Sequence, residues 1–406
     1  MNFTLSNRAR TLSMALMGLG LVVAGIGFVT TRSHDAAHAG QHFWSALFLN
    51  GFFFFGISLG ALFFYSLQWA TETAWSVLVR RVYEGIVGFL PIGAAVIVIC
   101  LLAGQFHLNH IWHWMDHRVY DPADLEHYDP IIAGKSAYLN APFFWLRVVL
   151  FMGTFIFAAN WFRKQSLKMD QLTGDDLRTQ HLLTYRRSAL FLVFFAVFSS
   201  VLSWDWLMSI DTHWFSTLYG WYIFAGMWCT AMVTGVIVVL YLKSKGYLPQ
   251  VNNNHIHDMG KWVFATSFLW SYLWFSQFML YWYANIPEEV AYAAVRIEHH
   301  PGLMWGMFFI NFAVPMVLLM SRDAKRNPRF LIGVGTVILI GHWLNVCQLV
   351  LPGVLGENFH QVGALEAGLG LFFLGLFVLI VLRTLTKAPL TVVNSPYLEE
   401  SVHHSI

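Results

Sequence analysis

The sequence is poor in charged residues. Only 11% of its 406 residues are Asp, Glu, Lys or Arg, whereas 57% are hydrophobic. A soluble domain carries about 25% charged residues, so this chain lacks the polar surface that soluble domains of its length need. A net charge of +2 gives no reason to expect nucleic acid as a partner. The composition predicts an all-α integral membrane protein.

Metal-binding patterns are also scarce. The three cysteines, Cys100, Cys229 and Cys347, lie in separate apolar segments and form no Cys-x-x-Cys pair, whereas iron–sulfur clusters and structural zinc need grouped ligands. Haem b inside a bundle needs two facing axial histidines, and only His342 lies deep in an apolar run. We therefore expect no metal, no haem and no covalent cofactor.

Long apolar runs, by contrast, are abundant. A membrane-spanning helix needs about 20 mainly apolar residues. Ten segments are long and apolar enough to be predicted as transmembrane helices: 11–31, 43–67, 85–106, 140–162, 188–208, 217–242, 262–283, 302–320, 330–351 and 363–382.

The basic residues are distributed unequally between the two sides of these spans. Nineteen of the 24 lie at the N-terminus and in every second loop, including the predicted loop 163–187, and Arg147 lies inside a span. The other side carries only four: Arg32, Arg118, Lys135 and Arg296. Cytoplasmic loops are enriched in Lys and Arg, so we predict a multi-pass protein with both termini in the cytoplasm.

Two short segments resemble each other. Residues 42–48 read HFWSALF and residues 213–219 read HWFSTLY, and each begins a span from the outer side. We predict two four-helix bundles, spans 2–5 and 6–9, with spans 1 and 10 peripheral. Interface anchors and solute carriers also produce such repeats. The predicted domains are 1–41 with helix 1, 42–208 for the first bundle, 209–351 for the second, and 352–406 with helix 10.

Few residues with a formal charge lie inside the predicted spans, and all of them lie in the outer half. They are Arg147, Asp205 and Glu366. Arg147 and Asp205 share a bundle and a depth, which indicates either a buried ion pair or a proton acceptor tuned by the arginine. The four residues 107, 110, 113 and 117 are histidines, and their spacing predicts one face of an interfacial helix that meets solvent or a partner.

His342 lies near the middle of span 9, and polar residues continue from it toward the outer side. Such a series favours either a proton path or a hydrogen-bonded contact between helices. The proton-path candidates are Asp205, His342, Asn345, Gln348, Asn311 and Glu366. Span 7 carries Trp274 and Tyr281 on one helical stripe with Gln277 beside it, and His42 and His107 lie at outer helix ends.

Three longer segments carry a family resemblance. Residues 138–147 read YLNAPFFWLR, residues 204–217 read WDWLMSIDTHWFST, and residues 274–289 read WFSQFMLYWYANIPEE. Together they resemble the ten-helix quinone-binding-type subunits of bacterial alternative complex III, a quinol:electron-acceptor oxidoreductase. These subunits belong to the polysulfide-reductase membrane-subunit (NrfD-like) family. The length and short tails resemble the second, F-type subunit more than the longer C-type one.

The resemblance implies a place in a respiratory or photosynthetic chain of a bacterial cytoplasmic membrane. Iron–sulfur clusters and c-type haems would then reside in partner subunits, and this chain would support quinol oxidation and conduct protons. Quinone, quinol or lipid would be its candidate ligands. The candidate quinone-binding residues are His42, His107, Trp274, Gln277 and Tyr281. The implied partners are a homologous C-type subunit, an iron–sulfur subunit, multihaem cytochrome c subunits, small membrane subunits and the quinol pool. Two alternatives stay open at this point: a purely structural scaffold that docks redox subunits, and a solute carrier.

Overall fold

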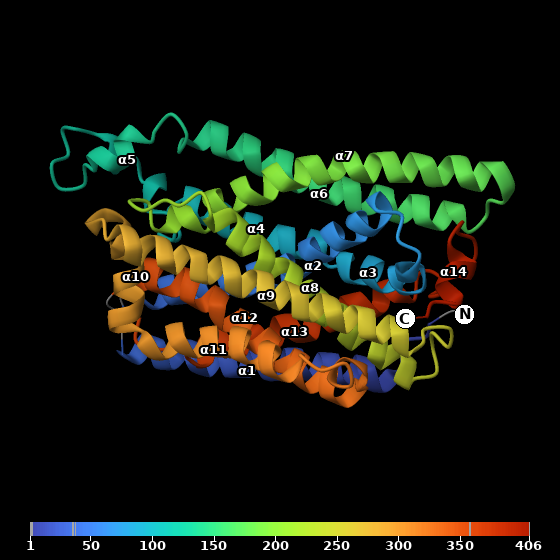
Figure 1. The fold of residues 1–406 in the computed structure, drawn as a ribbon. Helices are drawn as coiled ribbons and strands as arrows, with labels where there is room; N and C mark the ends of the chain where they lie inside the picture. Colours follow the sequence, from blue (N-terminus) through green and yellow to red (C-terminus); the bar gives the residue numbers. More distant parts are fainter. Residues whose placement is uncertain (1–2, 35, 37, 357–358, 406) are drawn as a thin grey trace.

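The computed structural model describes residues 3–34, 36, 38–356 and 359–405, and this part of the chain contains helices and no strand. Long helices run side by side along one axis (Figure 1). The long helices are α1 (Asn7–His34), α2 (Ala39–Ala70), α4 (Leu90–Gln105), α6 (Ala141–Met169), α7 (Gly174–Trp206), α8 (Tyr219–Ser244), α9 (Asn253–Ala284), α11 (Pro301–Leu318), α12 (Pro328–Leu355) and α13 (Ala364–Leu385).

Short helices mark the two ends of the molecule. Both termini and α14 (Leu398–Val402) lie at one end, which we call the basic end, and α5 (Pro130–Gly134) and α10 (Pro287–His299) lie at the other, which we call the loop end (Figure 1). The remaining short helices are α3 (Arg80–Val87) and the 3-10 turns η1 (Trp75–Val79), η2 (His113–Met115), η3 (His117–Tyr120), η4 (Met208–Ile210) and η5 (Ala324–Arg326).

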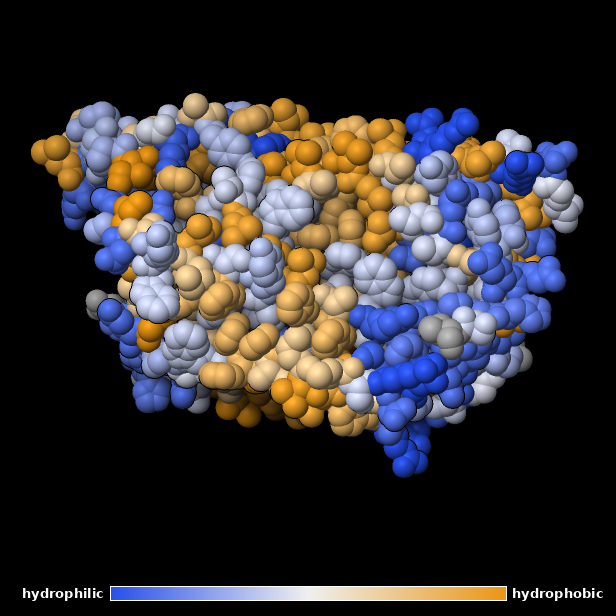
Figure 2. Space-filling model, in the orientation of Figure 1, coloured by the Kyte–Doolittle hydropathy of each residue, from blue (hydrophilic) through white to orange (hydrophobic). Residues whose placement is uncertain are grey.

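The predicted transmembrane character is confirmed. Among the described residues, nine helical segments are long and apolar enough to cross a membrane, the third being the composite Trp75–Gln105. Hydrophobic residues form a band across the middle of the molecule, and hydrophilic residues gather at its ends (Figure 2). The predicted span 262–283 lies in α9, which is 32 residues long but not among the nine, because polar and aromatic side chains interrupt its apolar sequence.

Helix α2 is the central helix of the fold. It packs against α4 and α7 from the N-terminal half of the chain and against α8 and α12 from the C-terminal half. Buried residues occupy all of its faces, including the four consecutive phenylalanines 52–55, as expected for a helix surrounded by protein. One continuous apolar core therefore extends through both halves.

The other long helices pack around α2 in two groups. In the first group, α6 packs against α4 and α7, which both contact α2. In the second group, α8 packs against α9, α9 against α11, α11 against α12, and α12 returns to α8. Helix α1 lies outside both groups, along α13. The second group contains the cavities described below.

Helices α1 and α13 approach each other closely through glycines. A Cβ atom on Gly20 would lie 2.4 Å from the backbone nitrogen of Phe372, and one on Gly368 would lie 2.3 Å from that of Ala24. Small residues let helix backbones approach in a membrane, where association depends on close packing rather than on the hydrophobic effect. The α1–α13 contact therefore depends on these glycines.

Replacing Gly368 by alanine should lower the thermal unfolding midpoint in detergent. The added methyl group has no space, and overpacking typically costs about 1–3 kcal/mol. Gly25→Ala is the matched control, because no atom lies within 4 Å of the added Cβ, and alanine favours helix over glycine by about 1 kcal/mol. The midpoint of Gly25→Ala should therefore stay equal or rise. Equal losses in both variants would contradict the proposed packing.

Three segments differ in local structure from what the sequence predicted. The stretch 163–187 is mostly helix, because α6 and α7 continue to Met169 and from Gly174. The predicted span 85–106 is interrupted between α3 and α4, just before Pro91, which cannot donate a backbone hydrogen bond. The predicted histidine face beyond α4 does not exist as one helix, since His107 has a positive φ of 56° and two separate 3-10 turns follow it.

Charged residues also lie deeper at the basic end than the sequence indicated. Arg80, Arg81 and Glu84 belong to α3 and are all buried. They lie within the membrane-length segment Trp75–Gln105, whereas the sequence pattern placed the two arginines in a loop. The basic half of the fold therefore contains a buried carboxylate, contrary to the expectation that formal charges occupy only the outer half.

Candidate functional site

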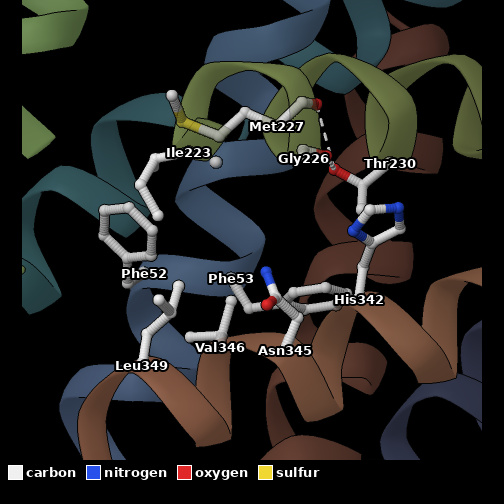
Figure 3. A pocket seen from close by; sticks show the side chains of 11 residues that line it. Phe52, Phe53, Ile223, Gly226, Met227, Thr230, His342, Asn345, Val346 and Leu349 are labelled. Carbon is white, nitrogen blue, oxygen red and sulfur yellow. Dashed lines mark hydrogen bonds between the residues drawn. The ribbon is translucent and has the colours of Figure 1, made fainter. Parts of the chain in front are cut away.

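His342 is the deepest polar group of the candidate site. It lies on α12, is 2% exposed, and packs edge-on against Trp270 of α9 with ring centroids 5.1 Å apart. Its ring extends toward α8, near Gly226 and Thr230 (Figure 3). A Cβ on Gly226 would lie 3.6 Å from Nδ1. Neither ring nitrogen has a hydrogen-bond partner among the described residues.

A small cavity lies beside this imidazole. Its volume is about 20 Å³, and its lining includes Phe52, Phe53, Met227 and Asn345 besides His342. The Thr230 hydroxyl does not satisfy the histidine, because it donates to the carbonyl of Gly226 at 3.0 Å, as Figure 3 shows. A cavity of this size holds one water molecule. We therefore expect an ordered water at His342, since buried polar groups rarely stay without a partner.

Asn311 adds a second unsatisfied polar group at this level. Its side chain, on α11, is fully buried, and neither Oδ1 nor Nδ2 has a partner among the described residues. A Cβ on Gly341 would lie 2.3 Å from its Oδ1, so the amide lies directly against α12 next to His342. Asn311 of α11 and His342 of α12 therefore lie side by side at the contact of these two helices.

A hydrogen bond connects this inner cavity to a second one nearer the loop end. The Tyr222 hydroxyl donates to Oδ1 of Asn345, and Asn345 lines the first cavity while Tyr222 lines the second. The second cavity has a volume of about 40 Å³. Two of its lining residues, Tyr281 and Gln348, have side-chain oxygens without a partner among the described residues.

Three of the quinone-binding candidates line this outer cavity: Trp274, Gln277 and Tyr281. Its volume of about 40 Å³ is far below the roughly 150 Å³ that holds a benzene ring. In this conformation the cavity has space for water molecules and not for a quinone ring. The other two candidates lie elsewhere, His42 in the first turns of α2 and His107 in the turn after α4.

Arg296 of α10 closes the outer cavity. It is 2% exposed, its Nη2 lies 2.8 Å from Oδ2 of Asp211, and its Nε donates to the carbonyl of Gln348 at 3.2 Å. Its guanidinium also lies 3.5 Å from the ring centre of Tyr292. Burial alone would lower the pKa of Arg296, but Asp211 together with the neighbouring Tyr292 and Tyr219 more than offsets this effect, and the pKa is raised.

The sequence pattern had placed Arg296 in an outer loop, so its role was missed. The acidic start of the segment at Glu288 and Glu289, with Val290 and Ala293 following, is typical of an amphipathic helix. That signal could have placed Arg296 on a helix. It could not have indicated that the helix folds over the ends of α8 and α12.

Arg147 and Asp205 form a separate, fully satisfied cluster in the first group of helices. The arginine Nε lies 2.6 Å from Oδ2 of Asp205 and its Nη2 lies 3.0 Å from Oδ1. The Tyr138 hydroxyl donates to the same carboxylate at 2.8 Å, and the guanidinium lies 4.1 Å from the ring centre of Tyr138. A carboxylate that already has three donors is suited to structure rather than to proton exchange.

Arg147→Met should destabilise the protein strongly, because it leaves the buried Asp205 carboxylate without its counter-ion. Breaking a buried pair typically costs about 3–5 kcal/mol, whereas replacing both partners by apolar groups is often neutral. The double variant Arg147→Met with Asp205→Leu should therefore recover most of the lost thermal stability in detergent.

The control for this experiment is Arg118→Met at the loop end. Arg118 pairs with Asp116 at 2.7 Å, but its side chain is 56% exposed. The hydrogen bonds from Arg118 hold the pKa of Asp116 well below its usual range, yet exposed pairs contribute little stability. A loss in Arg118→Met as large as that in Arg147→Met would contradict the argument from burial.

Glu366 also lies apart from the polar series at His342. Its carboxylate accepts the backbone N–H of Gly363 at 2.9 Å and caps the first turn of α13. Its backbone carbonyl accepts from Asn50 of α2 at 3.1 Å. The structure therefore brings together four of the six proton-path candidates and separates Asp205 and Glu366 from them.

No group of three His, Cys, Asp or Glu side chains within the described ranges could hold a metal ion. In comparisons with known proteins, no family model and no curated protein matches the chain. The candidate site therefore depends on its geometry: a buried imidazole, two cavities and a hydrogen-bonded connection between them.

Proposed function

We propose that this chain is an integral membrane subunit of a quinol-oxidising complex similar to alternative complex III. One observation carries the proposal: the three segments that resemble that family meet at the loop end. Asp205 of 204–217 pairs with Arg147 of 138–147. Within the second helix group, Ser216 donates to Gln277 of 274–289 at 2.7 Å.

The proposed architecture has ten transmembrane helices in two four-helix bundles, with α1 and α13 outside them. Helix α9 is the tenth spanning helix in this proposal, packed between α8 and α11. The polar residues that make α9 less apolar include Gln277 and Tyr281, which line the outer cavity. Their position inside the bundle accounts for the composition of α9 without removing it from the membrane.

The proposed role of the second bundle is to conduct protons between the membrane interior and the loop end. An imidazole can accept a proton on one nitrogen and release it from the other, and water beside it extends the hydrogen-bonded chain. The series runs from Asn311 and His342 through Asn345 and Tyr222 to the cavity below Arg296. Quinol oxidation releases protons, which gives this path its function in such a complex.

His342→Phe should lower the number of protons released per quinol oxidised by the complex reconstituted in vesicles. The ring fills the space beside Trp270 but cannot transfer a proton. General acid–base groups typically contribute about 10²–10⁴-fold, so proton release through this path should fall by at least tenfold. Quinol turnover by the partner subunits should also fall in this variant, and it should fall less when the membrane is permeable to protons than when it is sealed.

The matched control is His181→Phe, a buried histidine at the basic end whose Nε2 lies 2.9 Å from Glu72. Proton yield in this variant should equal that of the wild type. An unchanged proton yield in His342→Phe would remove the conduction role.

A structural scaffold is the second candidate function, and exposed aromatic residues at the loop end favour it. Phe215, Trp282 and Tyr283 are 64%, 70% and 90% exposed, and large aromatic residues are enriched where proteins bind one another. A scaffold would keep full proton yield in His342→Phe, whereas Trp282→Ala with Tyr283→Ala would dissociate the complex. Size-exclusion chromatography of the purified assembly distinguishes the two outcomes.

A further inference from the structure

The largest of the cavities described here lies at the basic end, away from the site at His342. Its volume is about 160 Å³, and it lies where α3 and α4 are interrupted, between α2, α6 and the end of α13. Its polar lining residues are Tyr65, Glu84, Asn160, Arg163, Thr384 and Lys387. No part of the proposed proton path uses this cavity.

The carboxylate in this cavity is already neutralised by its own surroundings. Glu84 lies 3.0 Å from Arg81 and accepts hydrogen bonds from Tyr65 at 3.1 Å and Ser166 at 2.6 Å. Arg81 also pairs with Asp170 at 2.5 Å. Since each of these oxygens has donors within the protein, Glu84 does not compensate the other cations of the cavity.

Two cations of the cavity have no carboxylate partner. Within the part of the chain that the structure describes, neither Arg163 nor Lys387 forms an ion pair. Nη2 of Arg163 donates to the backbone carbonyl of Thr384 at 3.0 Å, which fixes the guanidinium beside the cavity. The cavity therefore presents a positioned guanidinium and an ammonium, the two groups that bind phosphate best in proteins.

Apolar surface continues from the cavity toward the middle of the membrane. Pro91 and Asn160 are exposed at its edge. On α4 the same helical face continues to Ile99, which is 53% exposed, and on α6 it continues to Phe157, which is 69% exposed. A ligand here would contact cations at one end and apolar side chains beyond them.

We propose that this cavity binds the headgroup of an acidic phospholipid. The phosphate contacts Arg163 and Lys387, and the acyl chains lie along the exposed faces of α4 and α6. The basic end is the end predicted to face the cytoplasm, where the leaflet carries anionic lipids and basic pockets between helices bind their headgroups. The amphipathic lining favours a lipid over a free anion, because a free anion has no acyl chains that could pack against the apolar faces.

Native mass spectrometry of the full chain in mild detergent tests the proposal. With equal amounts of phosphatidylglycerol and phosphatidylcholine added, phosphatidylglycerol should remain bound preferentially. Each basic residue near a lipid surface contributes about 1 kcal/mol, so Arg163→Gln with Lys387→Gln should weaken phosphatidylglycerol retention by about tenfold or more. Lys387→Gln alone, at an exposed position, should weaken it by several-fold without disturbing the fold.

The matched control is Lys164→Gln with Arg383→Gln, two exposed cations on α6 and α13 that do not line the cavity. This variant should retain phosphatidylglycerol like the wild type. Equal losses in both double variants would indicate a diffuse charge effect and overturn the site. Equal retention of the two lipids by the wild type would also overturn it. Displacement of phosphatidylglycerol by inorganic phosphate added at millimolar concentration would overturn it as well.

Discussion

Every polar group that this fold takes out of water must be satisfied inside the bundle, and this constraint organises the rest of the structure. In lipid an unsatisfied donor or acceptor costs several kcal/mol. The chain meets the constraint at its core helix with residues that need no outside partner: α2 is buried on all faces and almost entirely apolar. Several of its polar side chains bond within the protein, as Asn50 does to the carbonyls of Ala46 and Glu366. Both groups of helices pack directly against α2, and the water-sized cavity beside His342 lies between α2, α8 and α12.

The remaining polar groups follow one of two solutions. Closed clusters satisfy themselves: Asp205 receives hydrogen bonds from Arg147 and Tyr138, and Glu84 receives them from Arg81 and its neighbours. Open groups, by contrast, have polar atoms without a protein partner. Both ring nitrogens of His342 lack such a partner within the described structure, and a water-sized cavity adjoins the ring. Only an open group can exchange a proton or bind a ligand without first breaking a stable contact. The distinction separates structural polar residues from functional ones better than residue type does.

The amino-acid pattern predicted nine of the helical segments as long and apolar enough to cross a membrane, and it placed His342 inside one of them, because both follow from the length of local apolar runs. It also placed Arg147 and Asp205 at one depth, where they form an ion pair. It could not predict that α10 folds back and inserts Arg296 beside Asp211, 85 residues away, because no local pattern encodes that contact. It also missed the buried position of Glu84. An Arg-Arg pair followed by a glutamate indicates a loop unless the closing helices, α6 and α13, are known.

The two groups of helices differ in the polar residues at their contacts. In the first group, α6 and α7 are joined by the Arg147–Asp205 pair, and such a buried pair resists separation because either charge alone would be stranded. In the second group, Asn311 of α11 lies against α12 next to His342, and neither side chain has a hydrogen-bond partner among the described residues. Opening the α11–α12 contact to water therefore breaks no ion pair, whereas separating α6 from α7 would leave two unpaired charges.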